Sequence, residues 1–114
     1  MIAVIFEVFP KSDQKDAYLA MAAEMKTLVD QIDGFVSVER FESLTTPGKL
    51  LSLSLWRDEA ALEEWRKLTR HRAAQKAGRE VMFDDYRLRV AAVIRDYGMT
   101  ERAEAPEDSR ALHG

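Results

Sequence analysis

The order of hydrophobic patterns along the 114-residue chain restricts it to few folds. Four segments alternate their side chains between two faces, as strands do: residues 2–9, 35–44, 50–56 and 86–97. Two segments between them carry apolar residues at helical spacing, the first capped by Ser12 or Asp13 and the second by Asp58. This β-α-β-β-α-β order predicts a ferredoxin-like α+β domain, with a four-stranded antiparallel sheet and both helices on one face.

Turn residues support the predicted ends of these elements. Gly34 is expected to end the first helix, and the Pro47-Gly48 pair is typical of the turn of a hairpin. Beyond residue 99, alanine, proline and charged residues dominate, and such a segment lacks the apolar side chains for a core. We therefore predict one domain over residues 1–99 and a flexible C-terminal tail over residues 100–114.

The predicted topology leaves one face of the sheet without helices. Its apolar residues are expected to be Ile5, Phe9, Phe35, Phe41, Trp56, Ala91 and Val93. Its polar residues, expected to meet partners of opposite sign, are Glu7, Glu39, Ser52, Ser54, Arg87 and Arg89. The opposite, drier side of the third strand is assigned to Leu51, Leu53 and Leu55. Soluble monomers rarely expose so large a patch, so the pattern predicts a two-fold homodimer in which sheet faces sheet.

Composition argues against several classes of protein. Because cysteine is absent, disulfides, thiol redox chemistry and thiolate metal sites are excluded, and a cytoplasmic location is expected. The 17 basic and 20 acidic side chains are mixed along the sequence, which argues against nucleic-acid binding. The first residues do not resemble a secretory leader, and no apolar run approaches the roughly 20 residues that cross a bilayer. We expect neither a nucleic-acid partner nor a membrane partner.

His71 is the first candidate for catalysis, because it is the histidine within the predicted domain. An imidazole pKa of about 6.5 suits proton transfer, and neighbouring arginines favour the neutral, proton-accepting form. A histidine on the helix surface, or a hydrogen-bonded histidine in the core, is the alternative. No second histidine and no carboxylate stands at a metal-ligand spacing, so we predict no metal site. Glycine-rich nucleotide loops and the G-x-S-x-G motif are also missing from the sequence.

Aromatic and methionine side chains suit a pocket between the helices and the sheet. Aromatic rings offer flat stacking surfaces, and methionine adapts to irregular ligands. The predicted pocket residues are Trp56, Tyr18, Met21, Met25 and Phe83. An ordinary hydrophobic core accounts for the same residues, and the sequence leaves the two alternatives open.

Two stretches of sequence resemble a known family. The segment WRDEAALEEW from Trp56 to Trp65, followed by HRAAQ from His71, resembles the antibiotic biosynthesis monooxygenase family. The segment GFVSVERF over residues 34–41 is similar to that family's second strand, and the resemblance extends over residues 1–99. It implies a dimeric α-β barrel with a pocket between the sheet and the helices of each subunit.

Several members of that family oxidise polycyclic phenols with molecular oxygen and without metal or flavin. The resemblance implies a cofactor-independent monooxygenase of a hydrophobic quinol or phenol, with His71 as base or proton relay, Trp65 as ring platform and Arg72 as anion stabiliser. Other members degrade haem, and Trp56 and Trp65 match that branch. Its axial histidine lies further along the helix than His71, and its first strand has an asparagine where this chain has Glu7. A haem-binding or haem-degrading protein and a non-catalytic dimeric binding module are the alternatives.

Overall fold

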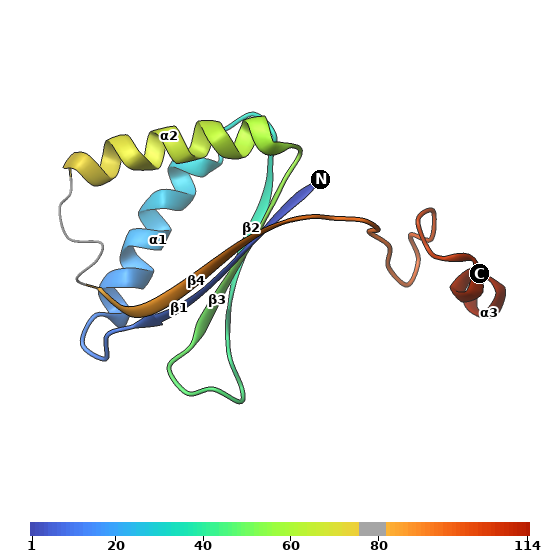
Figure 1. Cartoon of the computed structure of the whole chain (residues 1–114), viewed down its shortest axis with the longest axis horizontal. Coiled ribbons are helices and arrows are strands. Elements are labelled where there is room, and N and C mark those ends of the chain that lie inside the picture. Colours follow the sequence, from blue (N-terminus) through green and yellow to red (C-terminus); the bar gives the residue numbers. More distant parts are fainter. Residues whose placement is uncertain (76–81) are drawn as a thin grey trace.

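The computed structural model describes residues 1–75 and 82–114, and for residues 70–75 it describes the backbone alone. Its elements are β1 Ile2–Pro10, α1 Lys15–Val29, β2 Phe35–Glu42, β3 Leu50–Trp56, α2 Glu59–Gln75, β4 Phe83–Ala92 and α3 Glu107–His113. Helices α1 and α2 lie on one side of the sheet, whereas α3 lies apart from it (Figure 1). The predicted β-α-β-β-α-β order is confirmed. Within the described ranges, no helix has the length and apolar character that crossing a membrane requires.

The strands form one antiparallel sheet in the order β2-β3-β1-β4. Their register brings side chains of neighbouring strands together in rows that cross the sheet. One such row consists of Arg40, Ser52, Phe6 and Leu88. Phe6 packs against the core cluster that contains Tyr18 of α1. Because partnered residues share a face, the whole row lies on the side that the helices cover.

The hydrophobic core lies between this side of the sheet and the two helices, in two clusters. The first joins β1, β3 and both helices: Val4, Val29, Trp56, Ala61 and Leu62. The second joins β1, β3 and α1: Val8, Tyr18 and Leu50. Trp56 and Val8 are the largest fully buried side chains, and Trp56 has 1% of its surface exposed. Trp56 therefore packs β3 against the start of α2.

The faces predicted for β3 were wrong. Trp56 and Phe35, expected on the face without helices, belong to the helix-covered core, where their rings lie 5.3 Å apart between centroids. Ser52 and Ser54, also expected on the open face, line a cavity beneath the helices. Alternation shows which residues share a face but not which face meets the helices. The pairing of Ile2 with Trp56 decides this, because Ile2 packs against the helix-covered core.

The face without helices, here called the open face, carries the leucines of β3 instead. Leu53 pairs in register with Ile5 of β1 and with Glu39 of β2, and Leu51 pairs with Phe41. Phe41 remains 42% exposed. The expected placements of Ile5, Phe41 and Glu39 on this face are therefore confirmed.

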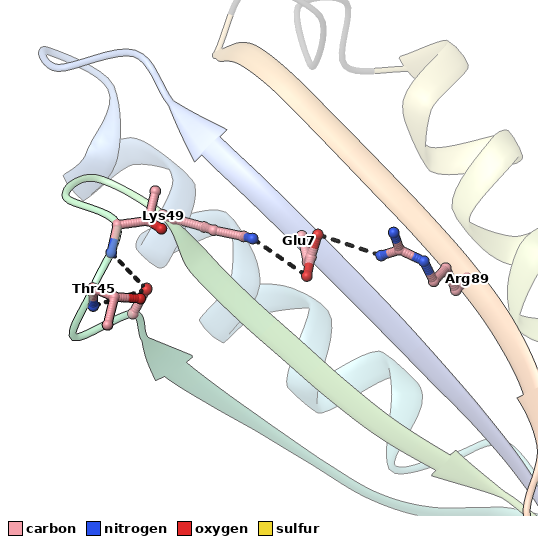
Figure 2. A network of polar contacts seen from close by, with 6 residues as sticks. Glu7, Thr45, Lys49 and Arg89 are labelled. Carbon is pink, nitrogen blue, oxygen red and sulfur yellow. Dashed lines mark hydrogen bonds and ion pairs between the residues drawn. The ribbon is translucent and has the colours of Figure 1, made fainter.

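Glu7 lies between two basic residues on the open face (Figure 2). Its Oε1 is 3.3 Å from Nζ of Lys49, and its Oε2 accepts a hydrogen bond from Nη1 of Arg89 at 3.3 Å. The hydrogen bond to Lys49, followed by that to Arg89, lowers the pKa of the Glu7 carboxyl against the opposing effect of burial. The expected pairing of opposite charges on this face is confirmed for Glu7 and Arg89.

Gly34, expected to end the first helix, instead lies directly before β2, because α1 already ends at Val29. It has the expected left-handed backbone, with a positive φ of 94°. A Cβ added there would lie 2.8 Å from Cβ of Ala61 and 3.2 Å from Cζ of Arg57. Ala61 is fixed in the core, with 3% of its surface exposed. The position therefore needs glycine both for its backbone conformation and for the close approach of α2.

We expect Gly34→Ala to lower the free energy of unfolding by about 2–4 kcal/mol, because left-handed backbone strain and overpacking against Ala61 add together. Gly48→Ala is the matched control, since Gly48 has a φ of 79° and no atom within 4 Å of an added Cβ. The control should lose only the strain contribution, about 1 kcal/mol. Urea denaturation followed by circular dichroism measures both variants. Equal losses would contradict the importance of the contact with Ala61.

The C-terminal segment differs from the prediction in two respects. β4 ends at Ala92 rather than at residue 97, and residues 107–113 form the short helix α3. Arg102 holds this segment together, because its Nε donates to the carbonyl of Gly114 at 3.0 Å and its guanidinium lies 5.3 Å from the ring centroid of Tyr97. Figure 1 shows the segment extending away from the sheet. The domain boundary at residue 99 and the flexibility of the tail remain predictions.

Candidate functional site

A cavity of about 600 Å³ lies between the sheet and helices α1 and α2. The sheet contributes Val4, Phe6, Arg40, Ser52, Ser54, Trp56, Phe83, Asp84, Asp85, Tyr86, Leu88 and Val90. The helices contribute Tyr18, Met21, Ala22, Met25, Leu62, Trp65, Arg66 and Thr69. Pockets for small organic ligands commonly have volumes of about 300 to 1,000 Å³ and mostly apolar walls. The cavity can therefore enclose a ligand of that size.

The structure brings the predicted pocket residues together. The cavity wall contains all five: Trp56, Tyr18, Met21, Met25 and Phe83. Trp65, expected to be a ring platform, lies on the same wall. The side chains of His71 and Arg72 lie outside the described part of α2. That any of these residues binds substrate or takes part in catalysis remains a prediction.

Aromatic rings form two walls of the cavity. On one side Trp65 lies over Trp56, with 6.3 Å between ring centroids and 34° between ring planes. On the other side Phe83 contacts Tyr18 edge to face at 5.5 Å, and it lies 6.3 Å from Tyr86. Such rings present both faces and edges to a ligand, so they suit a flat, electron-rich molecule.

The start of α2 sets the position of Trp65. Oδ1 of Asp58 accepts a hydrogen bond from the backbone N–H of Ala61 at 2.9 Å, which confirms the predicted cap. Arg57 donates to Asp58 and to Asp33, each at 3.2 Å. The hydrogen bond from Ala61, and then that from Arg57, lowers the pKa of Asp58, while Asp33 and Asp58 raise the pKa of Arg57. These contacts anchor the first turn, from which Trp65 extends over the cavity.

Arg40 is a charged residue of the cavity wall that was not among the predicted site residues. It lies on β2, and its Nε is buried without a hydrogen-bond partner among the described residues. Ser52 pairs with it in register, and the neighbouring Ser54 accepts a hydrogen bond from Nε1 of Trp56 at 2.9 Å. The signal in the sequence is a charged residue at an inward position of a strand, but it becomes visible only once the faces are known.

The cavity opens along β4. Tyr86, Leu88 and Val90 pair in register with Val8, Phe6 and Val4 and therefore lie on the helix-covered side. They nevertheless remain 61%, 53% and 45% exposed. Helices α1 and α2 thus leave this edge of the sheet uncovered, and a ligand can enter there.

The part of the chain that the structure describes contains no metal-binding site. No group of three histidine, aspartate or glutamate side chains is arranged there to hold an ion. Asp84 and Asp85 line the cavity side by side in sequence, but both are exposed. A two-residue acidic edge gives too few ligands for a structural cation.

Comparison with known proteins assigns the family. The family model for antibiotic biosynthesis monooxygenase matches residues 1–77. The chain belongs to the antibiotic biosynthesis monooxygenase family. A jasmonate monooxygenase of Pyricularia oryzae is 46% identical over 93 residues, which cover 82% of this chain and 43% of that protein. The matched part of this family member therefore covers less than half the length of the jasmonate monooxygenase.

Two solved structures share the fold of this family member. Rv0793 from Mycobacterium tuberculosis has a TM-score of 0.72 and 26% identity, covering 85% of this chain and 98% of that one. MhuD, solved as a mutant with two manganese protoporphyrin IX molecules bound per active site, has a TM-score of 0.70 and 14% identity. That match covers 86% of this chain and 99% of MhuD. At such low identity the likeness to MhuD concerns the fold alone.

Proposed function

We propose that this protein is a monooxygenase that oxidises a hydrophobic quinol or phenol with molecular oxygen and without a bound cofactor. The cavity carries the proposal, because a space of about 600 Å³ is bounded by the rings of Trp56, Trp65 and Tyr18. Membership of the antibiotic biosynthesis monooxygenase family supports oxidative chemistry. The relative named jasmonate monooxygenase supports a small organic substrate.

In the proposed reaction a base removes the phenol proton, and the resulting electron-rich anion reduces oxygen directly. Conversion of the phenol to a quinone consumes one oxygen molecule, of which one atom becomes the new carbonyl and the other leaves in water. We assign the base or proton relay to His71 and stabilisation of the anion to Arg72. Trp65 is the ring platform, and its place on the cavity wall supports this assignment. The apolar wall favours the reaction by limiting access of water.

We also propose that two copies associate through their open faces. Leu51, Leu53 and Leu55 lie on that face with Ile5, and it includes the half-exposed ring of Phe41. Covering this surface with an identical sheet would remove it from water on both subunits at once. The cytoplasmic location expected from the sequence remains a prediction.

We expect His71→Ala to lower substrate-dependent oxygen uptake by about a hundredfold or more, because general base catalysis typically contributes that factor. An oxygen electrode measures the uptake with a panel of quinols, to which jasmonate is added. His113→Ala is the matched control, since His113 belongs to the exposed helix α3, and it should retain full activity. Sedimentation of each variant checks that its assembly is unchanged.

Unchanged uptake by His71→Ala would remove His71 from the mechanism. Arg72→Gln is measured in parallel, because Arg72 is the proposed stabiliser of the substrate anion. No uptake by the wild-type protein with any quinol would favour a non-catalytic binding module.

Haem is the alternative cofactor, because MhuD binds a porphyrin in its active site. The described wall of the cavity offers tyrosine and methionine as axial ligand types, but neither histidine nor cysteine. His71 lies outside this described wall, and in the haem-degrading branch that the sequence resembles the axial histidine lies further along the helix than His71. The residues therefore do not favour a histidine-ligated haem. Titration of haemin into the wild-type protein should therefore leave the Soret band unshifted. A shift that disappears in His71→Ala would replace the cofactor-free proposal.

A further inference from the structure

We infer that Arg40 determines the specificity of the cavity, and that its ligand is an apolar molecule with one carboxylate. The inference depends on the proposed function only in taking the cavity as the substrate site. Arg40 lies on β2, the edge strand of the sheet farthest from the opening along β4. A ligand that enters along β4 and reaches Arg40 would therefore extend across the cavity.

The Nε atom of Arg40 is buried and lacks a hydrogen-bond partner among the described residues. An arginine side chain remains charged at any pH that the folded protein encounters. Burying part of a charged group without a partner is costly, and the cost is recovered when a polar or charged group binds to it. A ligand group that accepts a hydrogen bond at this position would supply the missing partner.

Acidic residues on the same strand do not neutralise Arg40. Glu39 is the adjacent residue and points to the open face, where it pairs in register with Leu53. Glu42 shares the face of Arg40, but its Oε1 is already 3.3 Å from Nζ of Lys15. Neither of these two carboxylates is therefore placed to pair with Arg40.

The remaining charged residues of the described wall lie elsewhere. Asp84 and Asp85 belong to β4, which is three strand spacings from β2, or about 14 Å across the sheet. Both are exposed to solvent, as is Arg66 on α2. Solvent can therefore hydrate these three side chains, whereas it does not reach Nε of Arg40.

A carboxylate matches this environment best. Its two oxygens fit the planar fork of a guanidinium, and its single negative charge balances one arginine. Ser52, the register partner of Arg40, lies beside the same position and can donate a hydroxyl hydrogen bond. Phe6 and Leu88 continue the same row towards the opening. They provide an apolar surface for the body of the ligand.

Calorimetric titration with three naphthalene derivatives tests the inference: 2-naphthoate, 2-naphthamide and 2-naphthyl phosphate. The wild-type protein should bind 2-naphthoate at least about tenfold more tightly than the amide. A hydrogen bond between charged groups contributes enough binding free energy for a difference of that size. It should also prefer 2-naphthoate to the phosphate. Absence of naphthoate binding, equal binding of acid and amide, or tighter binding of the phosphate would overturn the inference.

Arg40→Gln should abolish the preference for the acid over the amide, and Arg40→Lys should retain part of it by keeping the charge without the fork. Arg95→Gln is the control for net charge, because Arg95 lies in the exposed segment after β4 and outside the cavity wall. It should keep the full preference. Loss of the preference in Arg66→Gln, with Arg40→Gln unaffected, would assign the carboxylate to Arg66 and overturn the inference.

The titration does not measure oxygen uptake, so it separates this inference from the proposed function. A protein that binds 2-naphthoate through Arg40 but oxidises no quinol contradicts the monooxygenase and not the role of Arg40. A protein that oxidises quinols without preferring the acid contradicts the role of Arg40 alone. If Arg40→Gln fails to fold, the wild-type comparison and Arg40→Lys still decide the question.

Discussion

Trp56→Ala is expected to lower the free energy of unfolding by about 3–5 kcal/mol, the usual loss when a buried aromatic side chain is truncated in a core. Trp56 is 1% exposed and belongs to the cluster that joins β1, β3 and both helices. Its removal also leaves the hydroxyl of Ser54 without the hydrogen bond from the indole. Because domains of this size are stable by about 5–15 kcal/mol, the variant should be near the limit of folding.

Urea denaturation followed by far-ultraviolet circular dichroism measures this loss. Leu19→Ala is the control, since Leu19 lies on α1 with 39% of its surface exposed and should lose far less. Trp56→Phe, which keeps a ring in the core, should fall between the two. A Trp56→Ala variant as stable as the wild-type protein would show that the cluster around Trp56 is not the centre of the core.

Leu53→Asp is expected to separate the proposed dimer, with a rise in the dissociation constant of at least about a hundredfold. Leu53 lies on a central strand of the open face, between Ile5 and Glu39 in the register. An interface formed by two open faces would bury one new carboxylate from each subunit, and uncompensated buried charges cost several kcal/mol. Sedimentation at micromolar concentration measures the change.

Leu44→Asp is the matched control, because Leu44 lies in the connection between β2 and β3 and is 100% exposed. It should sediment as the wild-type protein does. Circular dichroism must show that Leu53→Asp keeps its secondary structure. A wild-type protein that sediments as a monomer, or a Leu53→Asp variant that stays dimeric, would contradict association through the open face.

The element order was predictable from sequence because local signals define it. Alternating strands and the cap at Asp58 depend on neighbouring residues alone, and the structure contains both. The predicted ends of the first helix were wrong: α1 begins after Gln14 without a side-chain cap from Ser12 or Asp13, and it ends at Val29, before Gly34. The short helix α3 was missed, since its sequence has few apolar residues and Arg102 organises the segment through contacts several residues away. Composition does not encode such contacts.

The orientation of β3 could not be derived from its own alternation. Three leucines on one side predict burial, and two serines on the other predict exposure, yet the serines lie under the helices. The pairing of Ile2 with Trp56 and the space occupied by the indole determine the choice. Because Ser52 and Ser54 face a cavity and not a packed core, placing their hydroxyl groups under the helices costs little free energy. The three leucines then lie on the open face.

The candidate site was predictable in its apolar part and not in its polar part. Tyr18, Met21 and Met25 follow helical spacing, so their common direction can be derived from α1 alone. Arg40 and Ser52 reach the same cavity from two strands whose faces were not known. Oxygen uptake by His71→Ala tests whether His71 acts as the base.

The chain has two tryptophans, and both lie on the wall of the cavity. All of its indole fluorescence therefore originates at the candidate site, with the two rings close enough to share one environment. A molecule that enters should change the emission intensity or wavelength without any attached dye. The wild-type protein is thus its own optical reporter, and a library of unlabelled compounds can be screened for occupancy before any reaction is known.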